Sequence, residues 1–69
     1  MKTTINSIEV EVYTISGQTF CDLTKGYYYG SLTAAEAEGC LWDSIWDQST
    51  PVSASTIAKI EAFALKHGW

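Results

Sequence analysis

Arginine is absent from this 69-residue sequence, and its four lysines, Lys2, Lys25, Lys59 and Lys66, are scattered along the chain. Eight acidic side chains give the chain a formal net charge of -4. Proteins recognise phosphates and base edges with guanidinium groups and clustered cations. The composition therefore argues against direct nucleic-acid binding and favours a protein partner.

Cysteine and histidine are also scarce, which limits the chemistry open to the chain. Cys21 and Cys40 are too far apart for a CxxC unit and too few for a disulfide framework, so we expect buried thiols. His67, the single histidine, lies close to the end of a predicted helix, where it suits the helix dipole better than catalysis. Three tyrosines fill the interior of Gly26–Gly30, which does not fit a phosphate-binding loop. We expect no catalytic residue, no metal site and no cofactor.

Long apolar runs are missing too. No stretch approaches the roughly 20 residues needed to cross a bilayer, and the first six residues lack the apolar core of a signal peptide. These features predict a protein of the cytoplasm without a membrane association. Hydrophobic residues nevertheless make up 46% of the chain, including three Trp, four Tyr and two Phe. That is enough for one compact core, whereas the length leaves no room for a second, so we expect residues 1–69 to form a single domain.

Residues 3–24 alternate apolar and polar side chains, with turn residues at short intervals, as antiparallel strands do. Asn6-Ser7 suits a two-residue hairpin loop, and Ser16-Gly17 and Lys25-Gly26 suit further reversals. The sequence therefore predicts an antiparallel meander of three or four strands within residues 2–30.

The strand predicted over residues 8–15 has two distinct faces. Ile8, Val10 and Val12 point one way, whereas Glu9, Glu11 and Tyr13 point the other. We expect the first set in the core and the second in water. Carboxylates on a wet strand face are not expected to act as general acids, because a raised pKa requires burial.

The hydrophobic period changes after Gly30. Thr33 and Glu36 have the spacing of a capping box, which predicts a helix over about residues 34–48. On that helix Leu41, Trp42, Ile45 and Trp46 would share a buried arc with Ala34 and Ala35, and Glu36, Asp43 and Asp47 would form an acidic stripe on the opposite side. Gly39 would lie in the helix interior, where it is destabilising relative to alanine.

Pro51 cannot continue such a helix, so residues 48–53 read as a connection to a second helix over about residues 54–67. Gly68 is the expected left-handed residue after its last turn, and Trp69 is expected to fold back on that turn. A short connection between helices usually makes antiparallel neighbours. The predicted fold is therefore α+β: a small antiparallel meander followed by a helical hairpin packed on one face.

The remaining surfaces suggest where a partner would bind. The acidic stripe Glu36, Asp43 and Asp47 is one candidate, although it is equally the water-facing side of an amphipathic helix. The run Tyr27, Tyr28 and Tyr29 is another, because a strand exposes at least one of these rings, although ordinary sheet packing would use them too. We take these six residues as the partner-binding set. Trp42 and Trp46 are expected in the core.

In its small size and acidity, its opening hairpin strands around residues 5–12 and the acidic segment Ala35-Glu36-Ala37-Glu38, the chain resembles the anti-CRISPR inhibitors that bacteriophages make against host defences. The resemblance implies a stoichiometric inhibitor that works in the bacterial cytoplasm. Such an inhibitor would cover either the basic nucleic-acid groove or a protein-docking face of a defence complex, with mixed aromatic and acidic contacts. The alternative is a structural or self-assembling phage accessory protein whose exposed strand edge pairs with a copy of itself. A monomer or a small homo-oligomer fits the sequence.

Overall fold

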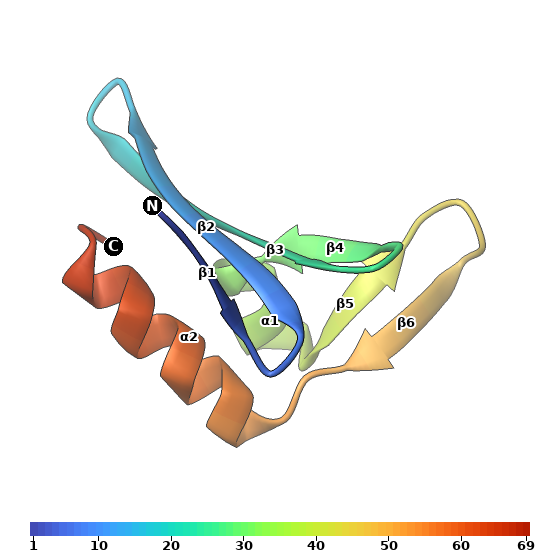
Figure 1. The fold of residues 1–69 in the computed structure, drawn as a ribbon. Coiled ribbons are helices and arrows are strands. Elements are labelled where there is room, and N and C mark those ends of the chain that lie inside the picture. The colour runs from blue at the N-terminus through green and yellow to red at the C-terminus, as the bar shows by residue number, and fades with distance from the viewer.

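The computed structural model describes residues 1–69 and shows a six-stranded sheet with two helices (Figure 1). The strands are β1 (Lys2–Ile5), β2 (Ile8–Ile15), β3 (Gln18–Lys25), β4 (Tyr28–Ser31), β5 (Cys40–Asp43) and β6 (Gln48–Pro51). The helices are α1 (Leu32–Glu38), between β4 and β5, and α2 (Ala54–Lys66), after β6. Neighbouring strands are antiparallel and follow the chain order, so the sheet is a meander. The predicted α+β class and the antiparallel meander are confirmed, but three or four strands was too few.

The hairpin turns of the first strands form as the sequence predicts. Ile5 pairs with Ile8, and the two residues between them, Asn6 and Ser7, have φ angles of 48° and 68°. Positive φ at both central residues is the type I′ geometry, which matches the twist of the flanking strands. In the next loop, Ser16 and Gly17 also both have positive φ angles, of 52° and 79°. These turns fix the register that places one set of β2 side chains in the core.

The segment predicted as a helix over residues 34–48 is a short helix followed by a β-hairpin. Helix α1 ends at Gly39, which has a φ of 70° and donates its backbone N–H to the Ala35 carbonyl at 2.8 Å. A left-handed residue of this kind closes a helix, and glycine adopts it without a Cβ clash. Beyond Gly39, Leu41 and Asp43 are buried whereas Trp42 is exposed, the two-residue period of a strand. The predicted helical arc and its acidic stripe are therefore wrong.

The start of α1 also differs from the prediction. Ser31 is the N-cap, and its hydroxyl accepts the Ala34 N–H at 3.2 Å, so Thr33 and Glu36 do not form a capping box. Helix α2 matches the predicted 54–67 to within one residue. Its C-terminal turn is also confirmed: Gly68 has a φ of 105°, and the Trp69 N–H reaches back to the Ala64 carbonyl at 2.9 Å.

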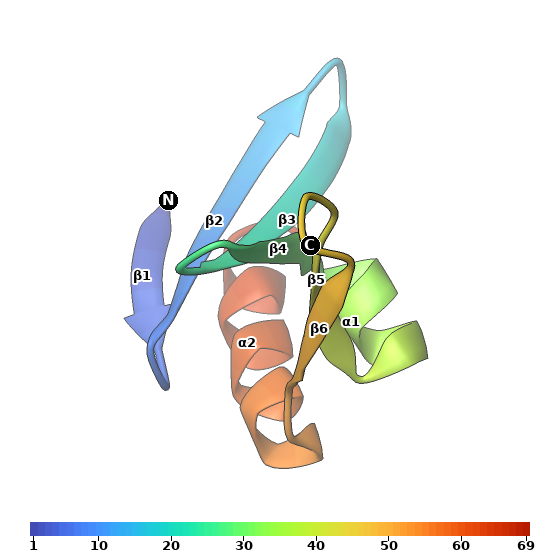
Figure 2. The ribbon, with the colours of Figure 1, turned by 90° about the vertical axis from the view of Figure 1, so that its right-hand side faces the viewer.

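The core lies between one face of the sheet and both helices (Figure 2). Its buried hydrophobic side chains are Ile8, Val10, Val12, Cys21, Leu23, Leu32, Ala35, Leu41, Val52, Ile60 and Ala64. Helices α1 and α2 contact each other within this layer. They do not form the predicted helical hairpin, because the chain adds β5 and β6 to the sheet before it returns as α2. Since both helices pack on one face, the other face of the sheet carries no helix.

Candidate functional site

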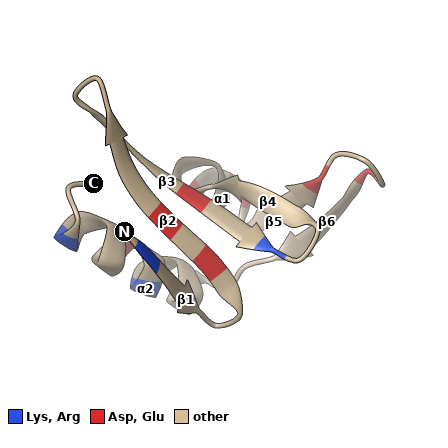
Figure 3. Ribbon diagram, turned by 45° about the horizontal axis from the view of Figure 1, so that its top comes forward, with Lys and Arg blue, Asp and Glu red and all other residues tan.

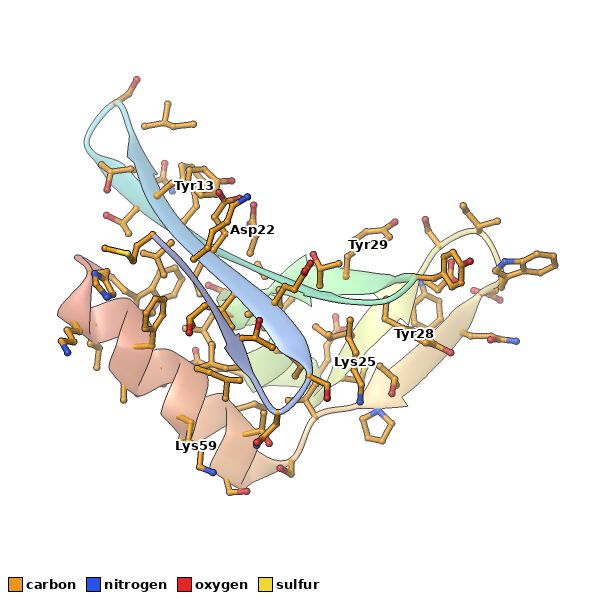
Figure 4. The ribbon with its side chains drawn as sticks, in the orientation of Figure 1. Tyr13, Asp22, Lys25, Tyr28, Tyr29 and Lys59 are labelled. Carbon is orange, nitrogen blue, oxygen red and sulfur yellow. The ribbon has the colours of Figure 1, made fainter.

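The uncovered side of the sheet, called the open face below, carries no helix (Figures 1 and 2). Strand pairing places its principal side chains together: Glu9, Glu11, Tyr13, Phe20, Asp22, Tyr29 and Trp42. Figure 4 shows Tyr13, Asp22 and Tyr29 on this side of the sheet, whereas Lys59 lies on α2, on the other side. The alternation that buries Val10 and Val12 is what turns their neighbours Glu9, Glu11 and Tyr13 outward, as the sequence predicts.

Aromatic rings occupy two places on the open face. Tyr13 of β2 stacks on its cross-strand partner Phe20 of β3, with ring centroids 5.4 Å apart and planes inclined by 22°. Tyr29 of β4 and Trp42 of β5 are paired in register and are 49% and 42% exposed. Tyr and Trp present a large area with few rotatable bonds, so they lose little entropy when a partner covers them.

Three carboxylates share strands β2 and β3 with the stacked Tyr13–Phe20 pair. Glu9, Glu11 and Asp22 line a shallow hollow of about 520 Å³ over β1, β2 and β3, together with Lys2. Figure 3 shows the three acidic positions side by side on β2 and β3, with Lys2 on the adjacent edge strand. The Lys2 ammonium is 3.8 Å from the Glu11 carboxylate, but both side chains are well exposed and such a pair contributes little to stability. The hollow is therefore open, polar and acidic.

The Tyr13 hydroxyl connects the aromatic and acidic parts of the face. It donates a hydrogen bond to Asp22 at 2.7 Å. This bond raises the pKa of Tyr13, and burial and the negative charges of Asp22 and Glu11 add to the rise. The protonated phenol thus joins the stacked ring pair to the Asp22 carboxylate.

The loop between β5 and β6 projects from the sheet and presents two large apolar side chains. Ile45 is 83% exposed and Trp46 is 70% exposed. Beneath them, the buried Asp43 carboxylate accepts the backbone N–H groups of Ile45 at 3.0 Å and Trp46 at 3.4 Å. The Tyr29 hydroxyl also bonds the Ser44 hydroxyl. We call Ile45 and Trp46 the hairpin tip; its backbone is fixed while its side chains stand in water.

The six residues predicted to bind a partner do not share one surface. Glu36 lies on α1, and Asp47 lies beside the hairpin tip. Tyr27 is 84% exposed in the β3–β4 turn, and Tyr28 sits on the core side of β4 with its hydroxyl 3.4 Å from Gln48. Of the six, Tyr29 alone belongs to the open face. Asp43 is 4% exposed and supports the β5–β6 loop.

Glu36 faces another carboxylate rather than a basic surface. A hydrogen bond with Glu61 of α2, followed by burial and the charge of Glu61, raises the pKa of Glu36 above its ordinary value of 4.5. The two carboxylates meet where α1 contacts α2, and they repel each other when both are charged.

Phe20, Asp22 and Trp42 belong to the open face but were not predicted there. The alternation of β3 contained the signal for Phe20 and Asp22, because both lie in register with the β2 residues already placed in water. Trp42, like Trp46, was predicted in the core as part of the helix, and its exposure corrects that prediction.

No three His, Cys, Asp or Glu side chains converge in a way that would hold a metal ion. No helix has the length and apolar character required to cross a bilayer. Comparisons with protein-family models, with curated proteins and with solved structures gave no match to this chain.

Proposed function

We propose that this chain is a protein-binding module that acts as a stoichiometric inhibitor of a nucleic-acid-binding defence complex, in the manner of anti-CRISPR proteins. One observation carries the proposal: the open face combines aromatic rings from four strands with three carboxylates and no organised reaction centre. Such a face suits a basic protein surface, because the rings supply contact area and the carboxylates supply charge complementarity.

The charges distinguish a protein partner from a nucleic acid. Aromatic sheet faces can also stack nucleobases, but they do so in a groove whose cations follow the phosphates. Here Lys2 is the one cationic side chain that lines the acidic hollow, and it is already near Glu11. Three carboxylates would repel a phosphate backbone and attract the Lys and Arg side chains of a protein that normally binds one.

Self-assembly by strand pairing at β6, one of the two edge strands of the sheet, receives little support from the geometry of that strand. The Val52 N–H bonds to the Gly39 carbonyl, so alternation directs the N–H groups of Thr50 and Gln48 towards β5 as well. Of the outward-facing positions, Pro51 has no N–H and Ser49 is left with one. A strand edge blunted by proline is a poor template for a second copy.

A phage-plating experiment tests the proposal. Bacteria with active CRISPR immunity against a phage are infected with and without expression of this chain, and efficiency of plating is measured. Inhibition predicts that plating recovers towards the value of a strain without immunity. The same chain mixed with the purified effector complex should give a fixed ratio of chains per complex by native mass measurement. Undiminished immunity against every effector type tested, together with no complex, would refute the proposal.

A further inference from the structure

The hairpin tip combines strongly exposed side chains with a hydrogen-bonded backbone. Ile45 and Trp46 are among the most exposed large apolar side chains of the chain. Asp43 accepts hydrogen bonds from both of their backbone N–H groups. A loop that is already ordered loses less entropy on binding than a flexible one, and Trp is the residue most enriched at binding hot spots.

The tip is also continuous with the open face. Trp42 lies on the open face of β5 and Asp43, the next residue, supports the loop. Tyr29 of the open face bonds Ser44 at the base of the loop. A partner that covers Tyr29 and Trp42 would therefore come within reach of Trp46.

Charge decides which kind of partner fits the tip. Between Lys25 and Lys59 the chain contains no cation, so α1, β5, β6 and their loops carry acidic groups alone. Figure 3 shows acidic positions at both ends of the β5–β6 loop and no basic one nearby. Loops and helices that enter membranes usually flank their apolar residues with Lys or Arg, which bind anionic headgroups. This loop has the opposite charge.

A second copy of the chain is a poor match as well. Tip-to-tip contact about a two-fold axis would bring Asp47 towards Asp47 on molecules that each carry a net charge of -4. Two side chains also cover far less than the roughly 800 Å² per partner of a stable interface.

From these observations we infer that the hairpin tip is an anchor, in which Trp46 enters an apolar pocket with a basic rim on the same protein that the open face binds. This inference rests on the proposed function. It adds a specific contact: the open face supplies area and charge, and the tip supplies the buried hot spot.

This inference is tested by measuring the affinity of chain variants for the effector complex that is inhibited in the plating experiment. Trp46→Ala should weaken binding by at least about tenfold, as hot-spot truncations do, whereas Trp46→Phe should stay within about threefold. Leu65→Ala on the outside of α2 removes an apolar side chain of 59% exposure and is the matched control, with unchanged affinity expected.

Wild-type affinity for Trp46→Ala would overturn the anchor while leaving inhibition intact. If no effector complex is inhibited, the proposed function fails, and the titrant becomes a purified host protein that wild-type chain retains from a bacterial lysate and Trp46→Ala does not. A lysate without such a protein overturns the anchor too.

Two measurements on the free chain test whether the hairpin tip instead binds a second copy of the chain or a membrane. Sedimentation equilibrium should show a monomer, and flotation with vesicles of phosphatidylcholine, alone or with one quarter phosphatidylglycerol, should leave the chain unbound. A dimer that Trp46→Ala dissociates, or vesicle binding that Trp46→Ala abolishes, would replace the protein pocket with a second copy or a membrane.

Discussion

Leu41→Ala should destabilise the fold strongly, whereas Trp46→Ala should leave its stability almost unchanged. Leu41 is 1% exposed in the core, so its truncation removes buried methyl groups and leaves a cavity, which costs about 3 kcal/mol. A domain of this length has a total stability of roughly 3.5 to 10 kcal/mol, so Leu41→Ala removes a large part of it. The corresponding fall in Tm is about 12 to 24 °C.

Trp46 is 70% exposed and contributes its backbone N–H, which alanine retains, to the loop. Its truncation should therefore change the free energy of unfolding by less than about 0.5 kcal/mol. Urea unfolding followed by circular dichroism compares the two variants with the wild type. A loss of several kcal/mol in Trp46→Ala would refute the hairpin, because a helix over residues 34–48 would bury Trp46 beside Leu41.

Three further predictions test the local chemistry. Burial, reinforced by the charges of Asp22 and Glu36, raises the pKa of the Cys21 thiol to about 11. At pH 8 a disulfide reagent should therefore react quickly with one thiol per folded chain, that of the half-buried Cys40. Two fast-reacting thiols would contradict this. The pKa of Glu36 is raised in the folded state, so its favourable contribution to the free energy of unfolding is present at acidic pH and is lost as pH rises through the folded pKa. Glu36→Gln should therefore raise Tm at pH 7 and change it little below about pH 4. Gly39→Ala forces a Cβ into a left-handed backbone at the end of α1 and should cost about 1 to 2 kcal/mol by urea midpoint, with Gly39→Asn costing less.

The meander of the first 31 residues was predictable because its signals are local. Alternation in β2 determines which side chains enter the core, and Asn6-Ser7 and Ser16-Gly17 place the reversals. The third turn lies one residue later than predicted, since Gly26 and Tyr27 form the loop and Tyr28 begins β4. That shift leaves Tyr27 outside the strand.

The failure over residues 34–48 has a physical cause. Leu41 and Ile45 are four residues apart, so they fit one face of a helix, and the Ala- and Glu-rich start of the segment strengthens that pattern. Gly39 was the contrary signal: it acts as the C-cap of a two-turn helix rather than as a tolerated interior residue. The rest was not accessible locally, because the exposure of Ile45 and Trp46 depends on β5 pairing with β4.

The candidate site was predictable in part for the same reason. Tyr13, Glu9 and Glu11 were placed together in water from β2 alone. The contribution of Trp42 depends on a long-range pairing with Tyr29 that leaves no pattern in either strand. Asp43 was taken for a surface charge, whereas its buried carboxylate organises the loop that follows it.

The role of the open face is tested most directly by charge reversal at Glu9, which is exposed beside the acidic hollow. Glu9→Lys changes the net charge by two units, and Ala58→Lys/Ala62→Lys, on the solvent side of α2, makes the same change elsewhere. Isothermal titration into the inhibited effector complex should show at least about tenfold weaker binding for Glu9→Lys and nearly unchanged binding for the α2 variant. Equal affinities for Glu9→Lys and the wild type would contradict binding through the open face.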